Sequence, residues 1–165
     1  MAFYCGGKAR YALISTVENR RLKQGVPMSQ LHTDPYINFQ GKAQEAFKFY
    51  QNALGGELTL MTFNPDGAPK PAGPNDPIMH GVLTADGAII MGSDGMAEYP
   101  AKVGENIAVA LSGEDEGRLN KAFDALSEGG NVKQALKVES WGDAFGWLED
   151  KYGINWMVNI VKPKA

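Results

Sequence analysis

Apolar and polar residues alternate most regularly near the end of the chain, between residues 154 and 161. One parity is apolar and the other largely polar: Ile154, Trp156, Val158 and Ile160 against Asn155, Met157 and Asn159. Because side chains of one parity share a face of a strand, one face of this segment can pack while the other meets water. The preceding strand is predicted at 144–148, so the chain ends in a hairpin. A hairpin is marginally stable alone and must cover another element.

Two segments have the spacing of amphipathic helices. Apolar residues recur every three or four positions over 43–54 and again over 119–126. The pairs Gly55-Gly56 and Gly129-Gly130 follow them, as glycines commonly do at helix C-termini. The pattern predicts two helices of about three turns, since 3.6 residues make one turn.

Five further segments have the composition of strands, with turn residues between them. They are 36–39, 57–63, 78–91 (a hairpin around Asp86-Gly87), 107–111 and 132–138. The stretch 64–77 contains five prolines, which exclude a regular helix or a central strand. It is predicted to be a long surface loop.

The order strand–helix–strand–strand–strand therefore occurs twice. Superposing Gly41 on Gly113, an offset of 72 residues, also brings Phe47 onto Leu119. Such a repeat predicts an α+β fold of two βαβββ modules, at 34–94 and 104–163, with curved sheets enclosing a cleft. Residues 1–33 are predicted to form a loosely held N-terminal extension.

Composition narrows the class of protein. The chain has 165 residues, 44% of them hydrophobic, and a net charge of −3, which gives no reason to expect a nucleic-acid partner. No apolar run is long enough to span a membrane. Cys5 is the only cysteine, so no intrachain disulfide can form, and a reducing cytoplasm is the expected compartment. The basic first 27 residues lack the apolar core of a secretory signal, and Met28 offers an alternative start.

Three segments carry a resemblance to a known family: PYINFQGKAQEAFKFYQNALGGEL, IMHGVLTADGAIIMGSDGM and ESWGDAFGWLEDKYGINWMVNI. Together they resemble the vicinal oxygen chelate superfamily (the glyoxalase/bleomycin resistance/dioxygenase fold), and most closely its PhnB-like branch. The similarity covers about residues 34–163, nearly everything but the N-terminal extension. It implies paired βαβββ modules with a ligand-binding cleft.

The resemblance also implies where a catalytic metal would be held. In metal-using members, four inward side chains, mostly His and Glu, come from the first, fourth, fifth and eighth strands. Here those positions carry Pro35, Met91, Asn106 and Met157. Proline and methionine do not suit hard or borderline divalent ions, and a one-residue slip brings in only one carboxylate, Glu105. We therefore expect no metal and no cofactor.

Several polar and aromatic residues are candidates for a ligand site. His80 is a candidate general base or hydrogen-bond donor, although a histidine in a sheet can also be purely structural. Asp94 is the other catalytic candidate, since it can accept a hydrogen bond from His80 or cap the turn at Gly95. Ser93 and Trp141 are candidate ligand contacts, and so are the residues at the vacated ligand positions: Met91, Asn106 and Met157.

These features predict a protein that binds a small molecule in the cleft, and they leave open whether it is an enzyme. The alternative is a metal-dependent lyase, isomerase or dioxygenase with a relocated site built from His80, Asp94 and either Asp143 or Glu105. No Gly-rich loop of the kind that binds a methyl-donor cofactor joins a first strand to a helix.

A homodimer is also predicted. The linker 92–104 is long enough to let the two modules be exchanged between chains. Trp141 and Trp147 are the expected contacts, because they give the last hairpin more aromatic surface than one small module readily hides.

Overall fold

The computed structural model describes residues 34–96, 100–102, 104 and 106–162. The predicted N-terminal extension and Glu105 lie outside these residues. The described residues divide into two compact units, one within 34–51 and 56–101 and the other within 52–55 and 102–162.

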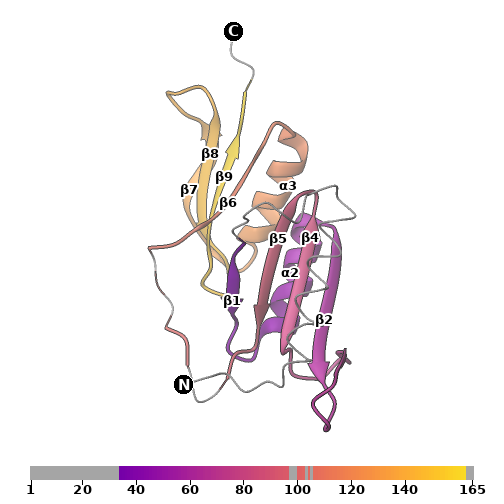
Figure 1. Ribbon diagram of the computed structural model, residues 1–165. Coiled ribbons are helices and arrows are strands. Elements are labelled where there is room, and N and C mark those ends of the chain that lie inside the picture. Colours follow the sequence, from indigo (N-terminus) through magenta and orange to yellow (C-terminus); the bar gives the residue numbers. More distant parts are fainter. Residues whose placement is uncertain (1–33, 97–99, 103, 105, 163–165) are drawn as a thin grey trace. The chain divides into compact units, whose positions relative to one another are not determined.

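The first unit is a sheet with one helix along one of its faces (Figure 1). In chain order its elements are β1 (Tyr36–Asn38), α2 (Ala43–Leu54), β2 (Glu57–Phe63), β3 (Pro69–Pro71), β4 (His80–Ala85) and β5 (Ala88–Ser93). The strand order in the sheet is β1-β5-β4-β2-β3, with β1 parallel to β5 and the other pairs antiparallel. Buried residues of α2 repeat at helical spacing toward the sheet: Ala43, Ala46, Phe47, Tyr50 and Leu54.

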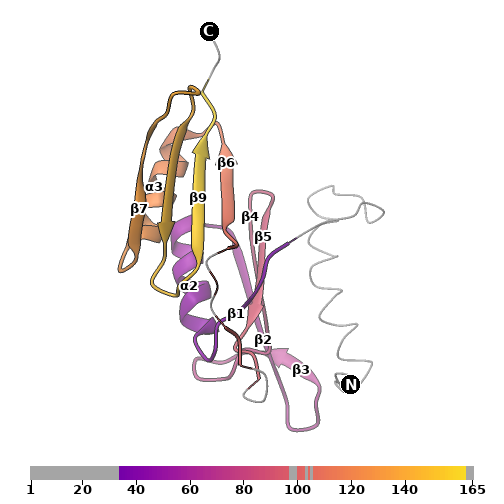
Figure 2. The same ribbon diagram turned by 90° about the vertical axis from the view of Figure 1, so that its left-hand side faces the viewer.

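The second unit repeats this plan (Figure 2). Its elements are β6 (Val109–Gly113), α3 (Glu116–Ser127), β7 (Asn131–Val138), β8 (Ala144–Glu149) and β9 (Asn155–Ile160). The strand order is β6-β9-β8-β7, again with the first strand parallel to the last. The prediction of an α+β fold with two βαβββ modules is confirmed, and β3 is an addition at the edge of the first sheet.

In both units a glycine of the sheet packs against a phenylalanine of the helix. A Cβ atom at Gly81 in β4 would lie 2.3 Å from Cε2 of Phe47, and one at Gly146 in β8 would lie 2.7 Å from Cε2 of Phe123. Real Cβ atoms do not approach that closely, so each glycine leaves the space that a phenylalanine ring of the helix fills. Glycine is required at these two positions because it has no side chain, not because of its backbone freedom.

Two expectations about individual strands need correction. The Pro-rich stretch 64–77 is not entirely loop, because Pro69–Pro71 pairs with β2 at the sheet edge, where a residue without an N–H is tolerated. The predicted strand at 132–138 is present, but its valines do not lie on a buried face, since Val132 and Val138 are exposed. Pairing of β7 with β8 shifts register twice, and such irregularities move side chains from one face to the other.

The corner of the last hairpin is built around one buried carboxylate. Asp150 accepts hydrogen bonds from the backbone N–H groups of Tyr152 (2.8 Å) and Ile154 (3.0 Å) and from Nε1 of Trp156 (2.9 Å). The hairpin therefore positions Trp156, which is fully buried, through polar contacts as well as packing.

Within the described part of the chain, no helix has both the length and the apolar character needed to cross a membrane.

Candidate functional site

The face of the first sheet that points away from α2 holds two of the predicted site residues. Gly81 faces α2, so alternation places His80, Val82 and Thr84 on the opposite face. Their cross-strand partners share that face, because directly paired residues point to the same side of a sheet. We call this set the open face of the first sheet, and its members are Tyr36, Glu57, Thr59, Met61, His80, Val82, Thr84, Ile89 and Met91.

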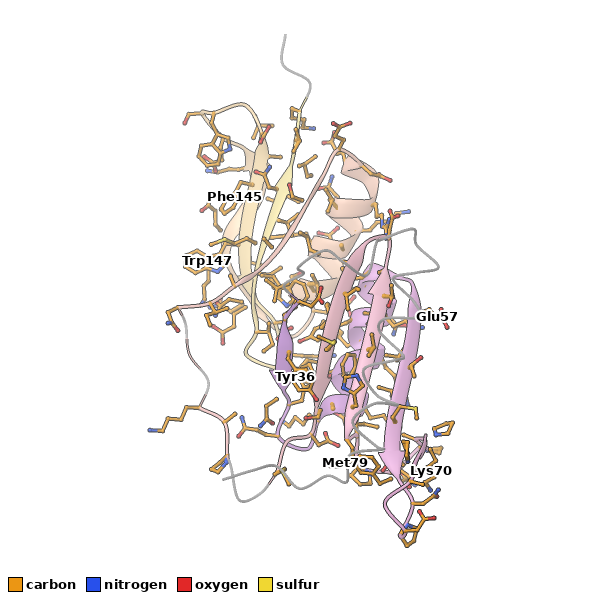
Figure 3. The ribbon with its side chains drawn as sticks, viewed as in Figure 1. Tyr36, Glu57, Lys70, Met79, Phe145 and Trp147 are labelled. Carbon is orange, nitrogen blue, oxygen red and sulfur yellow. The ribbon has the colours of Figure 1, made fainter. Side chains whose placement is uncertain are left out.

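His80 is buried on this face, with 8% of its surface exposed. Burial lowers the pKa of the imidazole below its ordinary value of 6.5, because a charged ring is poorly solvated there. The Tyr36 hydroxyl lies 3.5 Å from Nδ1, and the two rings are stacked with centroids 5.9 Å apart (Figure 3). Among the described residues Nε2 has no hydrogen-bond partner. In the tautomer in which Nδ1 accepts from Tyr36, Nε2 carries the proton and offers a donor.

Thr84 presents a second polar atom in the same situation. It is 7% exposed, and its Oγ1 has no hydrogen-bond partner within the described ranges. Val82 lies between it and His80 on the same face and packs with Ile89 and Met91 in an apolar cluster. A buried polar atom without a partner costs about 1–3 kcal/mol, so two of them on one apolar face are unusual for purely structural residues.

Asp94 has a different role from either of those considered in the sequence. Its carboxylate accepts hydrogen bonds from the backbone N–H of Ala43 (2.7 Å), the first residue of α2, and of Ile78 (2.6 Å), just before β4. The turn at Gly95 is instead bonded by the Ser93 hydroxyl, which accepts from the Gly95 N–H at 3.2 Å. Asp94 therefore holds the start of the helix against the end of β5. No local pattern signals this contact, which spans 51 residues.

The remaining candidates lie in the second unit. Asn106 is exposed and precedes β6, outside any strand. Met157 is on the face of the second sheet that points away from α3, and its cross-strand neighbour on that face is Trp147. Trp141 is 58% exposed and lies edge-on to Phe145, with 6.0 Å between the two ring centroids. The Asp143 carboxylate is occupied by hydrogen bonds from Nδ2 of Asn159 and from the Lys162 backbone.

The second sheet also has an aromatic face, which the sequence indicated through its tryptophans. Phe145 and Trp147 project from β8 on the side away from α3 (Figure 3). The Lys133 ammonium lies 5.3 Å from the Trp147 ring centroid and is paired with Glu149 at 3.0 Å. Trp147 Nε1 is buried and has no hydrogen-bond partner in the described part of the chain.

A relocated metal site is not assembled by the residues that the structure describes. Among them, no three His, Cys, Asp or Glu side chains are grouped so that they could hold a metal ion. The carboxylates of Asp94 and Asp143 each receive two hydrogen bonds from other groups. Pro35 contributes its carbonyl to the Met91 N–H at 3.0 Å, as part of the β1–β5 pairing.

Comparison with known proteins agrees with this architecture. A family model described as 3-demethylubiquinone-9 3-methyltransferase matches residues 32–159. Protein YjdN of Escherichia coli (strain K12) is 32% identical over 140 residues, covering 78% of this chain and 94% of that protein.

Two solved structures extend the comparison. Protein PA1353 from Pseudomonas aeruginosa is 34% identical, with a TM-score of 0.68 over 81% of this chain and 100% of that one. A putative 3-demethylubiquinone-9 3-methyltransferase, PhnB protein, from Bacillus cereus shares the fold at 22% identity, with a TM-score of 0.63 over 79% of this chain and 100% of that one. The chain therefore belongs to the PhnB-like family that this model describes.

Proposed function

We propose that the protein binds a small organic molecule on the open face of the first sheet, without a catalytic metal. The observation that carries the proposal is the pair of buried, unpartnered polar atoms, Nε2 of His80 and Oγ1 of Thr84, on a face with an apolar middle. A ligand with polar groups would supply the missing hydrogen bonds, and its apolar part would pack on Val82 and Met91. Ligand sites commonly combine an apolar lining with a few such polar groups.

The face can admit a ligand without a change of fold. Met61 and Met91 flank His80 and Val82 and are only partly buried. An unbranched thioether side chain has three rotatable bonds and adapts to what it contacts. Rotamer changes of Met61 would open space beside His80, and those of Met91 would open space beside Val82.

The methyltransferase named in the family description is not part of this proposal. The connection from β1 to α2, residues 39–42, contains Gly41 as its only glycine. Nucleotide-type cofactors are typically held by a Gly-rich loop that opens a helix, where several backbone N–H groups converge. The metal-dependent alternative is also set aside, because Asp94 and Asp143 already accept hydrogen bonds that hold the fold together.

The proposal is tested by a ligand screen with thermal shift as the readout. Met91→Glu should abolish stabilisation by any hit, because it buries a carboxylate on the apolar face without a partner. Met96→Glu is the matched control, since Met96 is already half exposed, and it should leave the shift intact. Met157→Glu, on the second sheet, shows whether that face also contacts the hit. A hit that binds the Met91→Glu protein unchanged contradicts the proposal.

We also propose that the fold needs no metal, because Pro35, Met91, Asn106 and Met157 occupy the positions where the superfamily holds one. The melting temperature is expected to change by less than about 1 °C on addition of EDTA, since no binding free energy is lost. Elemental analysis of the purified protein should show no stoichiometric divalent ion. A marked fall in the melting temperature with chelator would refute this prediction.

We further propose that the protein is a homodimer in which Trp147 lies at the contact. An interfacial tryptophan is the kind of residue whose truncation costs 2 kcal/mol or more, so Trp147→Ala should weaken the dimer by at least about thirtyfold. Val138→Ala, an exposed residue of the edge strand β7, is the control and should have little effect. Size exclusion with light scattering measures both. A mass near 17.8 kDa for the wild-type protein at micromolar concentration rules the dimer out.

A further inference from the structure

We infer that the ligand of the open face is an elongated, uncharged molecule with an apolar middle and a hydrogen-bonding group near each end. The inference rests on the proposed function and specifies its ligand class. It is carried by the spacing of the two unpartnered polar atoms and by the charges that surround them.

The spacing sets the length. His80 and Thr84 are four residues apart on β4, and a strand rises about 3.3 Å per residue, so their positions are separated by about 13 Å. Val82 lies midway between them, and Ile89 and Met91 pack beside it. A single compact polar group cannot reach both ends. A rod-shaped molecule with two or three apolar units and a polar atom at each end matches this pattern.

The charges exclude an anion. Residues of this face come from four strands, and in the described structure none of them is Lys or Arg. Lys70 in β3 pairs with Thr62, which has the opposite parity. The charged residue on this side is Glu57, which is paired with Thr84 and exposed (Figure 3). A carboxylate or phosphonate buried here would find no Lys or Arg among the described residues of this face, and burying an unpaired charge is strongly unfavourable.

The state of His80 agrees with this conclusion. Burial lowers the pKa of its imidazole, so at neutral pH the ring is uncharged and offers a hydrogen bond without positive charge. The Thr84 hydroxyl can both donate and accept. Each end of the face is therefore suited to a hydroxyl, amide or carbonyl group.

Three stilbenes of similar length test the inference: 4,4′-dihydroxystilbene, 4-hydroxystilbene and stilbene-4,4′-dicarboxylate. We expect the dihydroxy compound to bind roughly tenfold more tightly than the monohydroxy compound, because it makes one more buried hydrogen bond. The dicarboxylate should bind at least about a hundredfold more weakly than the dihydroxy compound. Binding is measured by calorimetry at pH 7.5, where the carboxylates are ionised.

Thr84→Val removes the hydroxyl at nearly constant volume and identifies the contact. It should lower the affinity for the dihydroxy compound roughly tenfold and bring it close to that of the monohydroxy compound. His80→Phe should weaken both hydroxylated probes. The Thr62→Val protein is the matched control, since Thr62 is a buried threonine of β2 with the opposite parity to Met61 and therefore faces away from the site.

The outcomes separate this inference from the proposed function. If the dicarboxylate binds as tightly as the dihydroxy compound, if the dihydroxy compound does not bind, or if Thr84→Val leaves the ratio unchanged, the ligand class is wrong. The proposed function survives each of these results as long as Met91→Glu still abolishes binding of a screening hit. If no probe and no hit binds in a Met91-dependent manner, the proposed function itself is overturned.

Discussion

Replacing Asp150 by alanine is expected to lower the free energy of unfolding by roughly 3–5 kcal/mol. The side chain is only 3% exposed, and its two oxygens accept three hydrogen bonds at the corner between β8 and β9. Removing it takes away the carboxylate that accepts from the Trp156 indole N–H, and Trp156 is inaccessible to water. Each buried donor left unpaired costs about 1–3 kcal/mol, and the loss of the carboxylate also leaves a small void.

Urea denaturation measures this difference in the free energy of unfolding. Two further variants serve as an intermediate case and as a control. Asp150→Asn keeps the side-chain volume and one acceptor oxygen. Its free energy of unfolding should therefore lie between those of the wild type and the Asp150→Ala protein. Asp124→Ala removes an exposed carboxylate from α3 and should change the stability by less than about 0.5 kcal/mol. An Asp150→Ala protein as stable as the Asp124→Ala protein would show that the hairpin corner does not depend on this carboxylate.

The second large effect is expected at Gly81. Gly81→Ala places a Cβ atom 2.3 Å from a ring carbon of Phe47, which is fully buried between α2 and the sheet. Neither the ring nor the strand can move without disturbing other packed atoms, and overpacking of this kind costs about 1–3 kcal/mol. Gly113→Ala in β6 is the matched control, because its Cβ would meet Leu119 at an ordinary 3.6 Å.

A double-mutant cycle tests the assigned cause. Phe47→Leu shortens the ring that the new Cβ would meet, so it should be less destabilising in the Gly81→Ala background than in the wild type. We expect an interaction free energy of about 1 kcal/mol or more between the two positions. Strict additivity of the two changes would indicate that Gly81 is required for some reason other than the contact with Phe47.

The sequence was most informative where residues repeat with a local period. The spacing of apolar residues from Ala43 to Leu54 coincides with α2, because the buried side of that helix is continuous along the chain. The alternation from Ile154 to Ile160 likewise predicted that Trp156, Val158 and Ile160 are buried. It was wrong for Asn155, which belongs to the polar parity and is nevertheless buried. The same reasoning failed for Val132 and Val138, because a strand at a sheet edge can shift register and let an apolar side chain face water.

The candidate site was less predictable than the fold, since its properties depend on pairing between distant segments. His80 was a candidate from its type and position, but the role of Thr84 appears only once the register of β4 shows that both side chains share an apolar face. Asp94 was interpreted from its neighbours in sequence, whereas its hydrogen bonds come from residues 51 and 16 positions away. No pattern of local period contains that information.

In each module the first strand pairs with the last, so the chain between them forms one long closed loop. The entropy of closing this loop bears on the Pro-rich insertion of the first module. Closing each sheet joins distant residues, Tyr36 with Met91 in the first module and Val109 with Trp156 in the second. The entropy lost on closing such a loop grows only with the logarithm of its length. The additional residues in the first module therefore raise its closure free energy by only about 0.1 kcal/mol. Chain entropy sets almost no limit on the length of the segment between β2 and β4.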